Sequence, residues 1–143
     1  MYAALMEAEN AFSEEEVPVG AIIVHKNRII GKGHNQVEKL KDPTAHAELI
    51  AITAACNHLN SPRLNECELY VTMEPCLMCI GAAIHARINK IYFSLFDPKF
   101  GACGSIYNIV DENKFNHEIK IYSGLLEQES KNLLTMFFGK LRK

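Results

Sequence analysis

The chain has 143 residues, of which 48% are hydrophobic, so it can bury one core and we expect a single domain over residues 1–143. Its formal net charge of −2 and isoelectric point of about 6.3 exclude neither nucleic acids nor small molecules as ligands. No apolar run approaches the roughly 18 residues of a membrane span, and the first residues predict no secretory leader.

Apolar residues follow helical and strand spacing in turn along the chain. The first helix is predicted over residues 2–12, and two apolar runs around Lys26-Asn27 predict a β-hairpin over 19–34. The later elements are expected in this order: a helix over 46–58, a strand over 68–73, a helix from Pro75 to about His85, a strand over 90–95, a short helix near 104–111, a strand over 118–122 and a helix from about 125 to 141. Helices between the last three strands favour parallel pairing, so we predict an α/β fold, a three-layer α/β/α sandwich with a mixed five-stranded sheet.

Two short segments offer an imidazole, two thiols and a carboxylate. One reads His46-Ala47-Glu48, and the other reads Pro75-Cys76-Leu77-Met78-Cys79. The two cysteines are three residues apart at the start of a predicted helix, where the helix dipole favours their thiolate forms. Three ligands with a fourth position open to water are typical of a catalytic zinc site rather than a structural one. An H-x-E motif followed by P-C-x-x-C is the known signature of zinc-dependent nucleobase deaminases.

His46 and Glu48 are two residues apart, which in the middle of a helix would place them on opposite faces. At a helix start, however, side chains lean toward the N-terminus and can overhang the end. We therefore predict that one Zn²⁺ ion is bound by His46, Cys76 and Cys79, and that Glu48 is the catalytic acid and base. The other cysteines lack ligand spacing and are expected to be small buried side chains, reduced in a cytoplasmic protein: Cys56, Cys67 and Cys103.

The chain resembles the bacterial tRNA-specific adenosine deaminases over nearly its whole length. Beyond the two zinc motifs, which indicate only the deaminase superfamily, the matching segments are 16–21, 33–35, 42–48, 71–79, 97–99, 115–117 and 137–138. The resemblance implies a cytidine deaminase-like fold and hydrolytic conversion of the wobble adenosine of tRNA to inosine, by zinc-activated water with Glu48 as the proton shuttle. It also implies a homodimer, and the anticodon stem-loop of an arginine tRNA as partner.

The same resemblance implies which residues bind the RNA. Asn35 would hydrogen-bond the flipped base, and Asp97 would contact a ribose of the anticodon loop. Neighbouring nucleotides would be bound by Asn116 and His117. The anticodon stem-loop would be held by three residues of the basic segment 114–143, whose six basic and three acidic side chains give a net charge of +3: Phe138, Lys140 and Arg142. From the residue pattern alone, each of these positions also fits a turn, a polar loop or a helix face.

Two other functions fit the same motifs. A small-molecule deaminase acting on guanine, cytosine or a nucleoside would use the same zinc chemistry, and it would release ammonia without any RNA. An inactive binding module would keep the metal only for structure, but the presence of Glu48 argues against it. The segment 94–96 also departs from the family, which usually has small residues and a charge at these positions.

Overall fold

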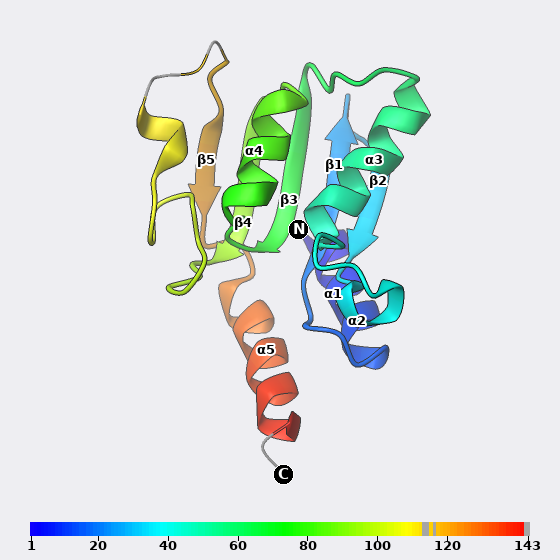
Figure 1. The fold of residues 1–143 in the computed structure, drawn as a ribbon, viewed down its shortest axis with the longest axis vertical. Helices are drawn as coiled ribbons and strands as arrows, with labels where there is room; N and C mark the ends of the chain where they lie inside the picture. Colours follow the sequence, from blue (N-terminus) through cyan, green and yellow to red (C-terminus); the bar gives the residue numbers. More distant parts are fainter. Residues whose placement is uncertain (113–114, 116, 142–143) are drawn as a thin grey trace.

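A five-stranded mixed sheet forms the centre of the molecule, with helices on both faces (Figure 1). The computed structural model describes residues 1–112, 115 and 117–141. Its elements follow in this order: α1 (Tyr2–Ser13), β1 (Gly20–His25), β2 (Arg28–His34), α2 (Val37–Leu40), α3 (Ala47–Leu59), β3 (Cys67–Met73), α4 (Leu77–His85), β4 (Lys90–Leu95), the 3₁₀ turn η1 (Ile109–Glu112), β5 (Lys120–Ser123) and α5 (Glu127–Leu141). Within these described residues, no helix combines the length and apolarity needed to cross a membrane.

The strand order is β2-β1-β3-β4-β5, and the pairing is mixed as predicted. β1 pairs antiparallel with β2 and with β3, whereas β3, β4 and β5 run parallel to one another. Lys26 and Asn27 both have positive φ angles, of 50° and 64°, which suits the tight turn between two twisted antiparallel strands. The predicted α/β sandwich with its mixed five-stranded sheet is confirmed.

Glycines let one helix approach each face of the hairpin. A Cβ on Gly20 would collide with the backbone of α1 at Ala4, and a Cβ on Gly33 would collide with the backbone of α3 at Ala47. The two helices therefore pack directly on strand backbone from opposite faces. α4 covers the same face of the sheet as α3 (Figure 1). Fully buried side chains of β3 and β4, such as Phe93, belong to the same hydrophobic core as residues of these two helices. At the other face α5 meets α1, where Phe12 and Phe137 pack edge to face.

Two predicted helices differ from the structure because the backbone there has other hydrogen-bond partners. α4 begins at Leu77 rather than at Pro75, since the Pro75 carbonyl accepts the Ala102 N–H (2.9 Å) and Cys76 forms an isolated β-bridge with Gly101. The short helix predicted near 104–111 is reduced to the turn η1, which starts at Ile109. Gly104, with a φ of 139°, and a β-bridge between Cys103 and Asn108 keep the preceding residues out of a helix.

The sequence pattern also missed α2, whose four residues are too short for periodicity to reveal. A distant side chain holds this helix. The carboxylate of Glu16, almost fully buried, accepts the N–H groups of Glu38 (3.1 Å) and Lys39 (2.8 Å). These donors belong to the first turn of α2, where backbone N–H groups have no partner inside the helix.

The close approach of α1 to β1 predicts that Gly20→Ala destabilises the protein. Its new methyl group would push α1 off the sheet, which should lower the free energy of unfolding by about 1–3 kcal/mol. Gly139→Ala in α5 is the control, because a Cβ there meets nothing and should raise stability by up to about 1 kcal/mol. Urea unfolding of both variants measures the difference, and an equal effect would contradict the packing described.

Candidate active site

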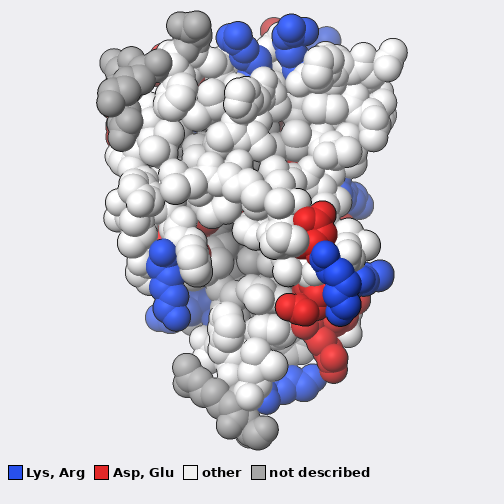
Figure 2. Space-filling model, in the orientation of Figure 1, with Lys and Arg blue, Asp and Glu red and all other residues white. Residues whose placement is uncertain are grey.

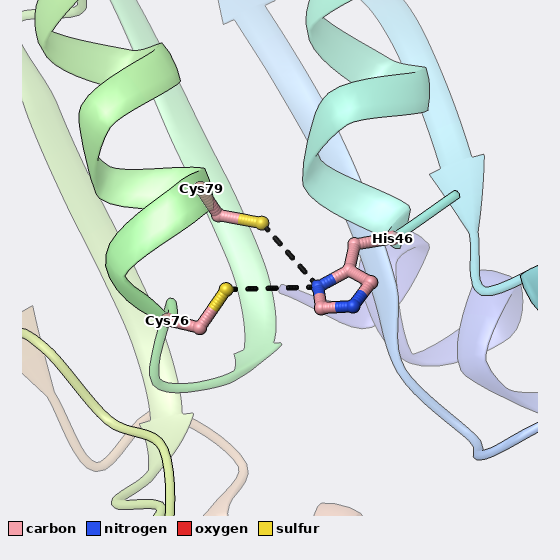
Figure 3. Close-up of side chains that lie close together, drawn as sticks. All are labelled: His46, Cys76 and Cys79. Carbon is pink, nitrogen blue, oxygen red and sulfur yellow. Dashed lines mark hydrogen bonds between the residues drawn. The ribbon is translucent and has the colours of Figure 1, made fainter. Parts of the chain in front are cut away.

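The starts of two helices meet beyond the C-terminal end of β3 and bring together one imidazole and two thiols. His46 is the N-cap residue of α3, Cys76 is the N-cap residue of α4, and Cys79 lies in the first turn of α4. Nδ1 of His46 lies 3.7 Å from Sγ of Cys76 and 3.6 Å from Sγ of Cys79 (Figure 3). All three side chains point toward one another across the gap between the helices, as Figure 3 shows.

This group could hold a metal ion. The three candidate ligand atoms lie within 4.8 Å of one another, and His46 and Cys76 are half-buried while Cys79 is buried. In a tetrahedral site with bonds of about 2.0 Å to nitrogen and 2.3 Å to sulfur, nitrogen and sulfur ligands lie about 3.5 Å apart. The observed separations fit that geometry, and no fourth His, Cys, Asp or Glu joins the group among residues 1–112, 115 and 117–141.

The electrostatics of the two thiols also favour a cation. The hydrogen bond from Cys79 is the main cause that lowers the pKa of Cys76 to about 4, and the same contact raises the pKa of Cys79. The hydrogen bond between the two thiols therefore favours ionisation of Cys76 over ionisation of Cys79. A bound cation would supply the positive charge that allows both sulfurs to ionise and bind it.

Glu48 lies in the first turn of α3 beside this group without being part of it. Its side chain is only 4% exposed, and burial raises its pKa to about 7, an effect that the positive charge of His46 partly opposes. The structure thus places a desolvated carboxyl group next to a three-ligand site. A carboxyl group with a pKa near neutrality can both take up and release a proton.

A large open cavity leads to the group. Its volume is about 940 Å³, and it lies between the ends of β3 and β4, α2 and the C-terminal helix α5. Charged side chains gather over α2 and the end of α1 at one side of a hollow, while most of this face is uncharged (Figure 2). The cavity is lined mainly by acidic, apolar and aromatic residues, with a few other polar side chains: Glu15, Glu16, Val17, Val19, Asn35, Val37, Glu38, His46, Glu48, Met73, Glu74, Cys76, Asp97, Pro98, Lys99, Phe100, Leu134, Phe137, Phe138 and Leu141.

Three of the residues predicted to bind substrate line this cavity. Asn35 accepts the Ala47 N–H through Oδ1 (3.0 Å), so it also holds the start of α3. Asp97 accepts the N–H of Lys99 (3.0 Å) through Oδ1 and stands at the end of β4. Phe138 contributes its partly exposed ring from α5.

The other four predicted residues do not reach the cavity or cannot be placed. His117 approaches the Ile88 carbonyl through Nε2 (2.6 Å), just before β4 begins, whereas the cavity lies beyond the other end of that strand. The six residues of β4 span roughly 20 Å, so one chain keeps His117 far from the metal group. Lys140 lies on α5 with Nζ 5.7 Å from the centre of the Phe12 ring. Asn116 and Arg142 lie outside the described residues.

Sequence reasoning gave no role to two residues that the structure draws into the site, Glu74 and Phe100. Glu74 is buried, and its carboxylate accepts four hydrogen bonds from the loop after β4. Its position just before Pro75 and Cys76 was the available signal. Phe100 lies in the cavity wall with 70% of its surface exposed, and nothing in its local pattern marked it.

A sequence profile of the MafB19-like deaminases matches residues 1–142. The tRNA-specific adenosine deaminase of Aquifex aeolicus is 55% identical over 97% of this chain and 91% of its own length. The corresponding protein of Bacillus subtilis is 43% identical over the whole chain and 89% of its own length. The chain belongs to the tRNA-specific adenosine deaminase family.

Solved structures agree with this membership. This deaminase matches a structure from a study of A-to-I editing by tRNA:A34 deaminases with a TM-score of 0.90, at 42% identity over 94% of this chain and 97% of the other. The guanine deaminase of Bacillus subtilis gives a TM-score of 0.65 at 30% identity, covering 99% of this chain and 90% of its own. The fold is thus common to deaminases with different named substrates.

The ligand geometry of this deaminase predicts that Cys76→Ala loses bound metal. Removing one of three ligands from a group with no fourth protein ligand in the described chain should bring the metal content from about one ion per chain to near zero. Mass spectrometry of the purified variant measures this content. Cys56→Ala is the control, because Cys56 is a free cysteine outside the group and its loss should leave the metal in place. Full occupancy in Cys76→Ala would refute the ligand assignment.

Proposed function

We propose that this protein hydrolyses the wobble adenosine of a tRNA anticodon to inosine, with one Zn²⁺ ion in each chain. The observation that carries the proposal is the buried Glu48, which lies beside the group formed by His46, Cys76 and Cys79 without being part of it, in the wall of an open cavity. Close sequence similarity to tRNA-specific adenosine deaminases supports the choice of substrate.

The donor set supports zinc as the ion. Two cysteine sulfurs and one imidazole nitrogen suit Zn²⁺ better than the hard cations Mg²⁺ or Ca²⁺, which prefer oxygen ligands. Three protein ligands leave one position for water, which is the arrangement of catalytic zinc sites. When bound here, Zn²⁺ would make water a nucleophile at neutral pH.

The protein's own residues would bind the base and move the protons. Hydrolysis breaks the bond between C6 and the amino nitrogen of adenosine, forms a C6–O bond, and releases ammonia. We propose that Glu48 takes a proton from the attacking water, passes it to N1, and then assists the departure of the amino group. Asn35, whose Oδ1 is occupied by the Ala47 N–H, would donate from Nδ2 to an acceptor on the base.

The shape of the cavity supports an RNA loop rather than a free base as substrate. A volume of about 940 Å³ is at the upper end for a small-molecule site, and Phe137 and Phe138 of α5 add aromatic surface to its wall. A target base in an anticodon loop can leave its stack at low cost, while its neighbours remain available for contact. Asp97 and Phe138, which both line the cavity, would contact these flanking parts of the loop.

We further propose that the protein acts as a homodimer on an arginine tRNA in the cytoplasm. His117 lies beyond the far end of β4, so it can contact RNA near the metal only if that site belongs to a second chain. Asn116 would act beside it. The five cysteines are free thiols, which agrees with a reducing compartment. The choice of arginine tRNA rests on the sequence resemblance.

The test is an RNA hairpin that carries the anticodon loop with adenosine at the wobble position. The zinc-loaded protein should convert this adenosine to inosine, while free guanine, cytosine and adenosine release no ammonia. Glu48→Ala should retain zinc and lose at least about 100-fold in turnover, the usual contribution of a general acid and base. Ammonia from free guanine without RNA would instead favour the small-molecule deaminase. Zinc loss in Glu48→Ala would mean that Glu48 is a ligand.

The C-terminal basic residues predict a salt-dependent contribution to RNA binding. Removing both charges in Lys140→Ala/Arg142→Ala should weaken hairpin binding, and the slope of log Kd against log salt should fall by about 0.7 for each lost phosphate contact. Fluorescence anisotropy between 50 and 200 mM salt measures this slope. The control is Lys26→Ala/Arg28→Ala in the hairpin turn, remote from the cavity, which removes the same charge. Equal slopes for the two double variants would exclude the C-terminal residues from the interface.

A further inference from the structure

Phe100 is an aromatic side chain that the fold leaves exposed at the mouth of the cavity. Its exposed fraction is 70%, although it lines the same cavity as His46 and Glu48. A phenylalanine this exposed buries little of its ring within the single chain. Its neighbours in the cavity wall, Asp97 and Lys99, are polar and charged.

The backbone around Phe100 is held in place. Asp97 closes a turn by accepting the Lys99 N–H (3.0 Å) and the Phe100 N–H (3.3 Å) through Oδ1, and its carbonyl accepts the Gly101 N–H (2.9 Å). Gly101 in turn pairs with Cys76 in an isolated β-bridge. The ring is therefore presented by a tight turn attached to a candidate metal ligand.

One buried carboxylate fastens this whole loop. Glu74 is 3% exposed, and its Oε1 accepts the Asp97 N–H (2.9 Å) and the Ser105 hydroxyl. Its Oε2 accepts the N–H groups of Cys103 (2.8 Å) and Ser105 (3.0 Å). A Cβ on Gly101 would collide with this carboxylate, so the turn closes directly over it. The four donors satisfy a buried charge that would otherwise be costly.

From this geometry we infer that Phe100 is a stacking surface for the RNA base next to the target adenosine, and that Glu74 is the positioning residue that fixes it there. The inference rests on the proposed function and adds to it a contact with a flanking nucleotide. Aromatic side chains at the edge of a site stack on unpaired bases, whatever the identity of the base. Lys99, one residue before the ring, can meet the phosphate of the same nucleotide.

Glu74 is suited to this role because it connects the loop that carries Phe100 to the start of α4, and these two parts must keep a fixed relative position. Its own backbone N–H donates to the Leu95 carbonyl at the end of β4 (2.9 Å), and Cys76 follows two residues later. One side chain thus ties the loop that carries Phe100 to the start of α4. Gln at this position would replace one of the two carboxylate oxygens by an amide N–H₂ group, which faces backbone N–H donors and cannot accept their hydrogen bonds.

The stacking contact is tested with three hairpins. One is intact, and each of the other two lacks the base of one nucleotide, either the one before or the one after the wobble adenosine. Phe100→Leu should lower kcat/KM on the intact hairpin by about 5- to 100-fold, the range for loss of one base–aromatic stack. Phe100→Tyr should restore activity because the ring is kept. The loss should vanish on one of the two abasic hairpins, on which wild type and Phe100→Leu become equal. Tyr2→Leu, at 73% exposure on α1 and outside the cavity, is the control and should match wild type.

The positioning role is tested by a double-mutant cycle between the two residues. Glu74→Gln should retain zinc and lower kcat/KM on the intact hairpin. The same change made in the Phe100→Leu variant should lower kcat/KM by a much smaller factor. Thr72→Val is the control for simple destabilisation, because it removes the buried acceptor of the Gly20 N–H (3.1 Å) two residues away. Thr72→Val should change kcat/KM by the same factor in the wild type and in the Phe100→Leu variant.

Several outcomes would overturn the inference. Equal activity of Phe100→Leu and wild type, or a loss that persists on both abasic hairpins, would remove Phe100 from the RNA contact. A change of oligomeric state in Phe100→Leu would assign the ring to a protein interface. Additive effects in the cycle would leave Glu74 with a purely structural role. Failure of the proposed function differs from all of these, because wild type itself would then form no inosine.

Discussion

The site depends on the close approach of two helix starts beyond the C-terminal end of β3. His46 is the N-cap residue of α3 and Cys76 is the N-cap residue of α4, so each helix presents its positive end and its unpaired N–H groups to the same small volume. The positive ends of the two helices favour the thiolate forms of Cys76 and Cys79. The pairing of β1 with β3 sets the distance, since α3 packs on the β1–β2 hairpin and α4 follows β3 directly.

Buried carboxylates organise the surroundings of this volume. The three acidic side chains that are buried among the described residues, Glu16, Glu48 and Glu74, all line the cavity. Glu16 holds α2 and Glu74 holds the loop after β4, each through backbone N–H donors. A carboxylate tied in this way serves structure, because its lone pairs are occupied. Glu48 stands beside the candidate metal ligands, with burial as the main cause of its raised pKa, which suits proton transfer.

The comparisons separate the fold from the choice of substrate. A guanine deaminase structure from Nitrosomonas europaea shares the fold with a TM-score of 0.81 at 22% identity, so this arrangement of helices and sheet does not by itself fix the substrate. Features outside the shared core must therefore distinguish a free base from an anticodon loop. In this chain the cavity wall away from the metal group is built by α2, the turn at Phe100 and the end of α5.

The sequence by itself determined the fold class, the order of the strands along the chain and the group of His46, Cys76 and Cys79 that could hold a metal, because these depend on local patterns: apolar periodicity, the Lys26-Asn27 turn, and the H-x-E and C-x-x-C motifs. Only the tertiary structure decided what occupies the cavity wall. It formed α2 and the loop at Phe100 through the carboxylates of Glu16 and Glu74, which lie more than 20 residues away in the chain. It also placed His117 at the far end of β4. Such contacts leave no periodic trace in a sequence, since their partners are backbone N–H groups that every residue except proline possesses.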